Sequence, residues 1–176
     1  MFKKYWKFFV IFWSVVLVGI IGVFVFFWLI SAGKLGFMPT FEELENPNNR
    51  FASEVYFADG PIMNRYFEKE NRKYIEYREI PQSVIDALIA TEDVRFYDHS
   101  GIDVRGLFRV AKGLLTANTS AGGGSTISQQ LAKMLFPRES DLNVFELVIR
   151  KFREWVIAVR LEKSYTKEEI LTMYLN

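Results

Sequence analysis

A run of 23 residues without a charged side chain, residues 8–30, constrains this chain more than any other feature of its sequence. As an α-helix the run would be about 34 Å long, enough to cross the hydrocarbon core of a bilayer. Trp6 and Trp28 lie near its ends, where aromatic rings favour the lipid headgroups. A cleaved signal peptide is the alternative, but its apolar region is normally about 7–15 residues long, and Ile30-Ser31-Ala32 is a poor cleavage site. We therefore predict an uncleaved transmembrane signal anchor at residues 8–30.

The basic residues before the anchor predict its orientation. Lys3, Lys4 and Lys7 precede the apolar run, and the first acidic residue, Glu42, comes more than thirty positions later. Because positive charges stay on the cytoplasmic side, residues 1–7 are expected to form a cytoplasmic tail. The rest of the chain is then extracytoplasmic.

The net charge of +1 averages over two stretches of opposite charge. Residues 34–103 carry 8 basic and 14 acidic side chains, whereas residues 104–169 carry 11 basic and 7 acidic ones. An anionic ligand is therefore expected on the later stretch. The 176 residues contain no cysteine, which excludes a disulfide framework and any thiolate metal site.

Residues 31–80 are predicted to form a linker and a short β segment. Residues 54–57 have the composition of a strand and lead into Asp59-Gly60, a pair typical of hairpin turns. Residues 74–78 alternate in polarity, which predicts a further strand.

From Pro81 onward the apolar residues follow the period of helices, so residues 81–176 are expected to be mainly α. Pro81 suits the start of the first helix. The others are expected at residues 104–115, after the glycines at 122–124, at residues 144–163 and after Thr166. Thr166 and Glu169 have the spacing of a capping box, which marks the start of that last helix.

Glu92 is the first candidate for chemistry, because it lies four residues after Leu88 and three after Ile89 on the apolar face of its predicted helix. A carboxylate at the end of a buried face is desolvated and suited to proton transfer. The structural alternative is a glutamate that faces solvent or pairs with Arg95. His99, the only histidine, is expected to form a structural hydrogen bond near this acidic group.

The glycines at 122–124 lead into a Ser-Thr pair and then into a predicted helix. Free backbone N–H groups at such a helix start bind anions, which predicts a phosphate or pyrophosphate site. Gln129 and Lys133 share one face of the helix, and Gln130 lies beside them. The long interval between the glycines and Lys133 excludes a P-loop, and a loop before an ordinary amphipathic helix is the alternative.

Arg150 and Lys151 precede Glu154 by four and three positions, so on a helix both cations can lie beside one carboxylate. A solvated surface salt bridge is the commoner explanation of this spacing. The functional reading pairs Glu154 with Glu92 across a cleft, where one carboxylate takes a proton while the other stays ionised.

These residues belong to four motifs that occur in order: Glu92-Asp93-x-x-Phe96-x-x-His99-x-Gly101, Gly123-Gly124-Ser125-Thr126-Ile127-x-Gln129-Gln130-Leu131-x-Lys133, Arg150-Lys151-x-x-Glu154, and Tyr165-x-Lys167-x-x-Ile170-Leu171-x-x-Tyr174-Leu175-Asn176. Their order and spacing resemble the first four motifs of glycosyltransferase family 51, the peptidoglycan glycosyltransferases. This module occurs in class A penicillin-binding proteins and in monofunctional transglycosylases. The resemblance covers about residues 81–176.

The resemblance implies a lysozyme-like helical glycosyltransferase domain, here incomplete at its C-terminal end, on the outer side of the bacterial cytoplasmic membrane. Its expected activity is the polymerisation of lipid II into β-1,4-linked glycan strands with release of undecaprenyl pyrophosphate. Glu92 would be the general base for the acceptor hydroxyl. Glu154, the second catalytic residue, would organise the neighbouring cations or a divalent metal, Mg²⁺ or Mn²⁺.

The resemblance also implies a set of substrate-binding residues: Ser125, Thr126, Gln129, Gln130, Lys133, Arg150, Lys151, Asp93, Phe96, Arg109 and Arg138. The expected partners are lipid II, the growing glycan chain, the membrane and other cell-wall synthesis proteins, with no nucleic acid. Two alternatives stay open at this point. One is a lytic transglycosylase acting on murein, and the other is a non-catalytic membrane-anchored scaffold.

Overall fold

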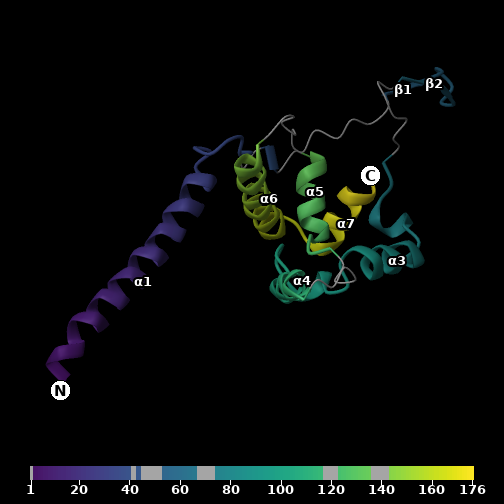
Figure 1. Ribbon diagram of the computed structural model, residues 1–176. Helices are drawn as coiled ribbons and strands as arrows, with labels where there is room; N and C mark the ends of the chain where they lie inside the picture. The colour runs from purple at the N-terminus through teal and green to yellow at the C-terminus, as the bar shows by residue number, and fades with distance from the viewer. Residues whose placement is uncertain (1, 41–42, 45–52, 67–73, 117–122, 136–142) are drawn as a thin grey trace. The chain divides into compact units, whose positions relative to one another are not determined.

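The computed structural model describes residues 2–40, 43–44, 53–66, 74–116, 123–135 and 143–176 of the chain (Figure 1). The described part is mainly helical, as predicted. The chain divides into two compact units. The first unit comprises residues 1–38 and 142–156, and the second comprises residues 39–141 and 157–176. Helix α6, Val144–Ser164, contributes its N-terminal part to the first unit and its C-terminal part to the second.

Helix α1, Phe2–Ser31, contains the predicted anchor and begins within the basic tail. It is the one helix, among the residues that the structure describes, that is long and apolar enough to cross a membrane. Its end is set by Gly33, which adopts a φ of +70°. Gly33 N–H donates to the Ile30 carbonyl and Lys34 N–H donates to the Leu29 carbonyl, each at 3.0 Å, which is the hydrogen-bond pattern of a Schellman motif.

The end of α1 packs on α6 within the first unit through aromatic rings. Phe152 of α6 meets Phe26 and Phe27 of α1 edge to face, with ring centroids 5.3 Å and 5.6 Å away. Trp155 adds a further edge contact with Phe152 at 5.1 Å. Arg153 also donates from Nη1 to the Phe37 carbonyl at 3.4 Å. Edge-to-face pairs of this kind stabilise beyond the area that they bury, so they fix the C-terminal end of α1 against α6.

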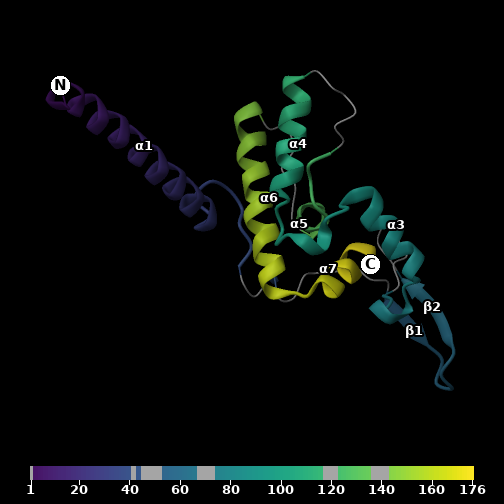
Figure 2. The ribbon, with the colours of Figure 1, turned by 90° about the horizontal axis from the view of Figure 1, so that it is seen from below.

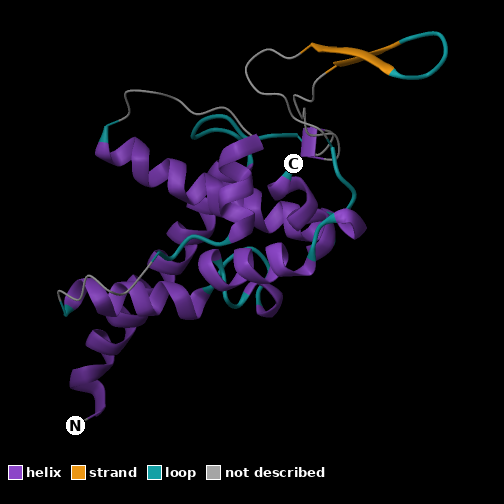
Figure 3. Ribbon diagram, turned by 90° about the vertical axis from the view of Figure 1, so that its right-hand side faces the viewer, coloured by secondary structure: helices purple, strands orange, loops and turns teal. Residues whose placement is uncertain are grey.

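Strands β1, Ser53–Tyr56, and β2, Ile62–Tyr66, form the antiparallel hairpin predicted around Asp59-Gly60 (Figure 3). Gly60 has a φ of +103°, which explains why the turn needs a glycine. Glu54 lies opposite Arg65, and the two side chains form an ion pair at 2.8 Å. The hairpin prediction is confirmed.

The strand predicted at residues 74–78 is wrong. Its second half belongs to a 3₁₀ turn, η1, Tyr77–Glu79, which a capping box between Glu76 and Glu79 holds in place. Its extended part is paired by a side chain instead of by another strand. Ile75 N–H donates to Asn176 Oδ1 at 2.8 Å, and Asn176 Nδ2 donates to the Ile75 carbonyl at 3.1 Å. The alternating polarity therefore reflects an extended segment that has no strand beside it among the residues that the structure describes.

The predicted helices of the second unit are present: α3, Gln82–Glu92; α4, Val104–Leu115; α5, Ile127–Leu135; and α7, Lys167–Leu175. A second 3₁₀ turn, η2, Phe96–Asp98, follows α3. Helix α7 begins with the predicted capping box, in which Thr166 Oγ1 accepts from Glu169 N–H at 3.3 Å and Glu169 Oε2 accepts from Thr166 N–H at 2.7 Å.

Helices α5 and α7 contact each other and lie side by side in both ribbon views (Figures 1 and 2). The core of the second unit includes these large, fully buried apolar side chains: Ile85, Phe96, Ile127, Leu131, Leu161, Ile170 and Leu171. Helices α5 and α7 supply two of these side chains each. Helix α3, the turn η2 and the second-unit part of α6 supply one each. This core holds the C-terminal end of α3 and the N-terminal end of α5 in fixed positions, and the candidate site lies there.

Candidate functional site

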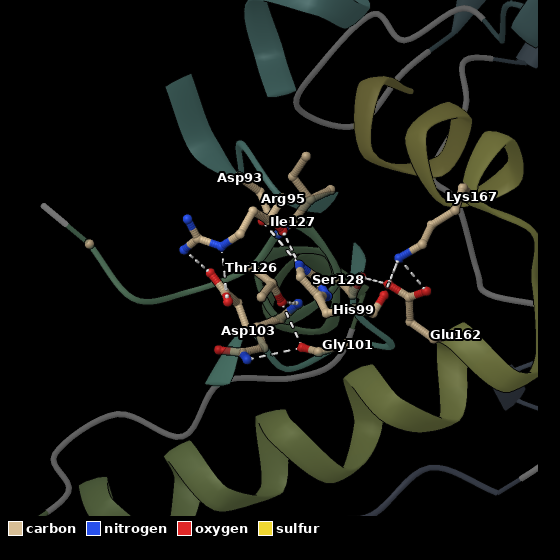
Figure 4. A network of polar contacts seen from close by, with 12 residues as sticks. Asp93, Arg95, His99, Gly101, Asp103, Thr126, Ile127, Ser128, Glu162 and Lys167 are labelled. Atoms are coloured by element: carbon tan, nitrogen blue, oxygen red, sulfur yellow. Dashed lines mark hydrogen bonds and ion pairs between the residues drawn. The ribbon is translucent and has the colours of Figure 1, made fainter. Parts of the chain in front are cut away.

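Asp93 connects three segments of the second unit. It follows α3 directly, and its side chain is buried. His99 Nε2 lies 3.0 Å from both carboxylate oxygens, and Ile127 N–H donates to Oδ2 at 3.1 Å (Figure 4). Since a carboxylate only accepts, His99 carries its proton on Nε2. The structural hydrogen bond predicted for His99 is therefore confirmed, and it joins the loop after α3 to the start of α5.

The start of α5 binds an internal anion. Ile127, its first residue, gives its N–H to Asp93, and Gln129 gives its N–H to Thr126 Oγ1 at 3.2 Å. The negative carboxylate of Asp93 also suits the positive end of the helix dipole. The sequence predicts these N–H groups as free donors for phosphate, and the structure corrects this point, because the protein's own side chains already bind two of them.

Glu92, the last residue of α3, is exposed, so its burial on an apolar face is wrong, and the alternative of a helix-terminal glutamate that faces solvent is confirmed. The helix ends here, and it is the next residue, Asp93, that turns into the core. Glu92 Oε2 accepts a hydrogen bond from Gln130 Nε2 of α5 at 2.7 Å. Gln130 Oε1 in turn accepts from the Tyr174 hydroxyl of α7 at 2.9 Å.

Glu92 lies at a pocket of about 290 Å³ in the second unit. The predicted site residues that line it are Glu92, Asp93, Arg109, Ser125, Thr126 and Gln130. Arg109 reaches it from α4 and donates from Nη2 to the Gly123 carbonyl at 3.3 Å. The pocket thus lies between the end of α3, the start of α5 and one face of α4, and it combines a carboxylate, a guanidinium group and a hydroxyl.

Arg95 and Asp103 form an ion pair in the wall of the same pocket. Arg95 Nη2 lies 2.5 Å from Asp103 Oδ2, and both side chains are largely buried. The hydrogen bond from Arg95 lowers the pKa of the Asp103 carboxyl, and the Gly106 backbone N–H lowers it further. Asp103 in turn raises the pKa of the Arg95 guanidinium. Arg95 therefore pairs with Asp103 and not with Glu92, the partner considered from the sequence. Asp103 was not identified from the sequence.

Three predicted site residues of the second unit lie away from the pocket lining. Gln129 is fully buried, and its Nε2 donates to the Gly101 carbonyl at 3.1 Å. Phe96 is also fully buried, and Lys167 Nζ lies 4.2 Å from the centre of its ring. Lys133 lies two turns into α5 and is half-buried. For Gln129 and Phe96 this burial indicates a structural contribution in place of direct contact with a ligand. Arg138 lies outside the described residues.

Arg150, Lys151 and Glu154 lie on the part of α6 that belongs to the first unit. Lys151 Nζ is 3.1 Å from Glu154 Oε2, and the Glu154 side chain is buried, so the predicted proximity of cation and carboxylate is present for this pair. No three potential metal ligands gather anywhere in the described ranges. With a lysine ammonium against its carboxylate, Glu154 does not fit a divalent metal site by itself.

Comparison with known proteins agrees with the motifs. The family model described as "Transglycosylase" matches residues 59–176. Penicillin-binding protein 1A of Escherichia coli is 38% identical over 139 residues, 79% of this chain and 16% of that protein. Penicillin-binding protein 1A of Haemophilus influenzae is 38% identical over 148 residues, 84% of this chain and 16% of that protein. The protein of the same name from Vibrio cholerae is 33% identical over 161 residues, 92% of this chain and 18% of that protein. The chain thus spans less than a fifth of the length of these relatives.

Proposed function

The chain belongs to the transglycosylase family, and we propose that the protein is a peptidoglycan glycosyltransferase that polymerises lipid II into β-1,4-linked glycan strands. Family membership supports the glycosyl-transfer chemistry. The likeness to proteins named penicillin-binding protein 1A supports a role in cell-wall synthesis. The geometry around Glu92 supports the assignment of the residues that carry out the reaction.

The contrast between Glu92 and Asp93 carries the proposal. Asp93 is buried and bonded to His99 and Ile127, so it is committed to the fold. Glu92 is exposed at the pocket, and Gln130 donates to one of its oxygens. A general base must stay accessible to the proton that it abstracts, and Glu92 meets that condition where Asp93 does not.

In the proposed reaction Glu92 takes the proton from the 4-hydroxyl of the acceptor N-acetylglucosamine. The hydroxyl oxygen attacks C1 of the N-acetylmuramic acid at the reducing end of the growing chain. The new C1–O bond forms with inversion as the bond from C1 to the pyrophosphate oxygen breaks, and undecaprenyl pyrophosphate leaves. At about 290 Å³ the pocket is at the lower end of the range for small-molecule sites, which suits one sugar of the acceptor and not the whole lipid-linked molecule.

The leaving pyrophosphate needs cations and hydrogen-bond donors, because its negative charge grows in the transition state. In the second unit we assign this task to Lys133 together with Ser125 and Gln130. For Arg150 and Lys151, which belong to the first unit, the same task is an expectation from the motifs. Arg109, which lines the pocket, would contact the sugar or the lipid-linked phosphate. Within this proposal Glu154 acts through Lys151, because its carboxylate holds the ammonium group at 3.1 Å.

Helix α1 would anchor the protein in the cytoplasmic membrane, where a lipid-linked substrate is available. The proposed orientation places Lys3, Lys4 and Lys7 inside and the rest of the chain outside. Because the chain has no cysteine, single substitutions give unambiguous probes. In intact cells a membrane-impermeant maleimide should label Asp59→Cys and leave Lys7→Cys unlabelled, and the reverse pattern would contradict this orientation.

The function is tested by incubating the purified protein with labelled lipid II in detergent or vesicles. The proposal predicts a polymer that muramidase digests to disaccharide units. A lytic enzyme would instead release anhydro-muropeptides from purified murein and make no polymer. A non-catalytic scaffold would do neither, so either of these results would overturn the proposed function.

A further inference from the structure

Tyr174 forms the end of a hydrogen-bonded row that leads to Glu92. The Tyr174 hydroxyl of α7 donates to Gln130 Oε1 at 2.9 Å, and Gln130 Nε2 of α5 donates to Glu92 Oε2 at 2.7 Å. Both Tyr174 and Gln130 are half-buried, whereas Glu92 is exposed. The row therefore starts in a partly enclosed position between two packed helices and ends at the pocket.

The direction of the row follows from its two ends. A carboxylate can only accept, so Gln130 must present its NH₂ group to Glu92 and its carbonyl oxygen to Tyr174. Burial raises the pKa of the Tyr174 hydroxyl, and the negative charge of Glu92 raises it further. Tyr174 therefore keeps its proton at neutral pH and can donate it to the carbonyl oxygen of Gln130.

The carboxamide of Gln130 needs such a partner, because its oxygen and its NH₂ group are almost equal in shape and packing alone does not fix which of them faces Glu92. If it turned over, its oxygen would lie against the Glu92 carboxylate, and a donated hydrogen bond would be replaced by repulsion between two acceptors. Tyr174 is well held for this purpose. Its helix packs on α5, and two residues further on Asn176 bonds to both backbone groups of Ile75.

We propose that Tyr174 is a positioning residue, which fixes the carboxamide of Gln130 so that Nε2 donates to Glu92 and orients the carboxylate for proton abstraction. This inference rests on the proposed function of Glu92. Tyr174 is absent from the lining of the pocket, so it acts through Gln130 and not on a ligand.

The test is a double-mutant cycle in the lipid II polymerisation assay. Tyr174→Phe removes one hydrogen bond and should lower kcat about five- to tenfold with little change in KM. In a Gln130→Ala background the same substitution should change kcat less than about twofold, because the group that it positions is absent. Equal losses in the two backgrounds, or no loss in either, would overturn the proposal.

Thermal unfolding separates positioning from a general loss of structure. Tyr174→Phe should keep the cooperative unfolding of the unmodified protein while its kcat falls, because it removes one hydroxyl and no apolar contact. The matched control is Tyr56→Phe, which removes a hydroxyl bonded to Glu54 in the hairpin. Its rate should equal that of the unmodified protein. A fall in kcat of Tyr174→Phe that accompanies a loss of cooperative unfolding would contradict the positioning role.

A measurement without substrate keeps this proposal separate from the proposed function. In the ¹⁵N-labelled full chain in detergent micelles, Tyr174→Phe and Glu92→Gln should each shift the side-chain NH₂ resonances of Gln130, whereas Tyr56→Phe should not. If the unmodified protein makes no polymer but these shifts occur, the proposed function fails and the row stands. Unshifted resonances in Tyr174→Phe would overturn the row itself.

Discussion

The carboxylate of Asp93 accepts a hydrogen bond from the backbone N–H of Ile127 at 3.1 Å, across 34 positions of sequence. This bond ties the end of α3 to the first residue of α5. Glu92 directly precedes Asp93, and Gln130 lies three residues after Ile127 in the first turn of α5, so the bond also holds the proposed base near its hydrogen-bond donor. The two adjacent acids thus have different tasks. Asp93 holds the end of α3 against the start of α5, and Glu92 stays exposed at the pocket.

Asp93→Asn should destabilise the protein. The amide puts an NH₂ donor in place of one carboxylate oxygen, so this donor lies against the buried His99 Nε2–H, and the remaining hydrogen bonds lose their charged acceptor. The expected cost is about 1–3 kcal/mol of unfolding free energy, measured by urea denaturation. Glu92→Gln is the matched control, because an exposed residue should change the unfolding free energy by less than about 0.5 kcal/mol. Equal effects of the two substitutions would contradict the structural role of Asp93.

Gly101→Ala should be more damaging than Gly60→Ala. Both glycines have positive φ angles, +91° at Gly101 and +103° at Gly60, so alanine is strained at either position. A Cβ at Gly101 would lie 2.9 Å from backbone atoms of Ala158, whereas a Cβ at Gly60 meets nothing within 4 Å. Overpacking adds about 1–3 kcal/mol, so the difference in unfolding free energy should be at least about 1 kcal/mol. Equal losses would show that backbone strain alone decides the cost.

The Asp103–Arg95 ion pair should make the free energy of unfolding decrease at acidic pH. Arg95 holds the pKa of Asp103 below its ordinary value of 3.8, so folding favours the ionised carboxylate. This contribution is complete above the unfolded-state pKa and is lost as the pH falls through the lower folded-state pKa. Asp103→Asn should therefore lose stability at neutral pH and show a flatter decline below about pH 4 in urea unfolding. If stability declined below about pH 4 as steeply in Asp103→Asn as in the unmodified protein, Asp103 would not contribute to the acid dependence.

Local signals in the sequence predict most of the helices. Pro81 marks the start of α3, and the capping box of Thr166 and Glu169 marks the start of α7, because each acts within one helical turn. The strand predicted at residues 74–78 fails for the opposite reason. Its backbone is paired by the side chain of Asn176, 101 positions away from Ile75, and no local pattern contains that information.

The sequence predicted which residues form the candidate site better than it predicted what each of them does. The motifs name Glu92, Asp93 and Gln130, which the structure places together. Helical periodicity left burial and exposure of Glu92 both open, and it does not show that the helix ends there and that Asp93 enters the core instead. The contribution of Tyr174 was hidden for a similar reason, since its contact with Gln130 depends on how α7 packs against α5.

The role of Glu92 as the general base of a lipid II polymerase is tested by comparing polymer formation by the unmodified protein with that by Glu92→Gln. Asp86→Asn is the matched control, because Asp86 lies on the same helix and bonds only locally to Gln82 in the described contacts. We predict that Glu92→Gln lowers the initial rate at least about a hundredfold with unchanged thermal unfolding, while Asp86→Asn retains the full rate. A Glu92→Gln variant that polymerises labelled lipid II at the unmodified rate would contradict the account.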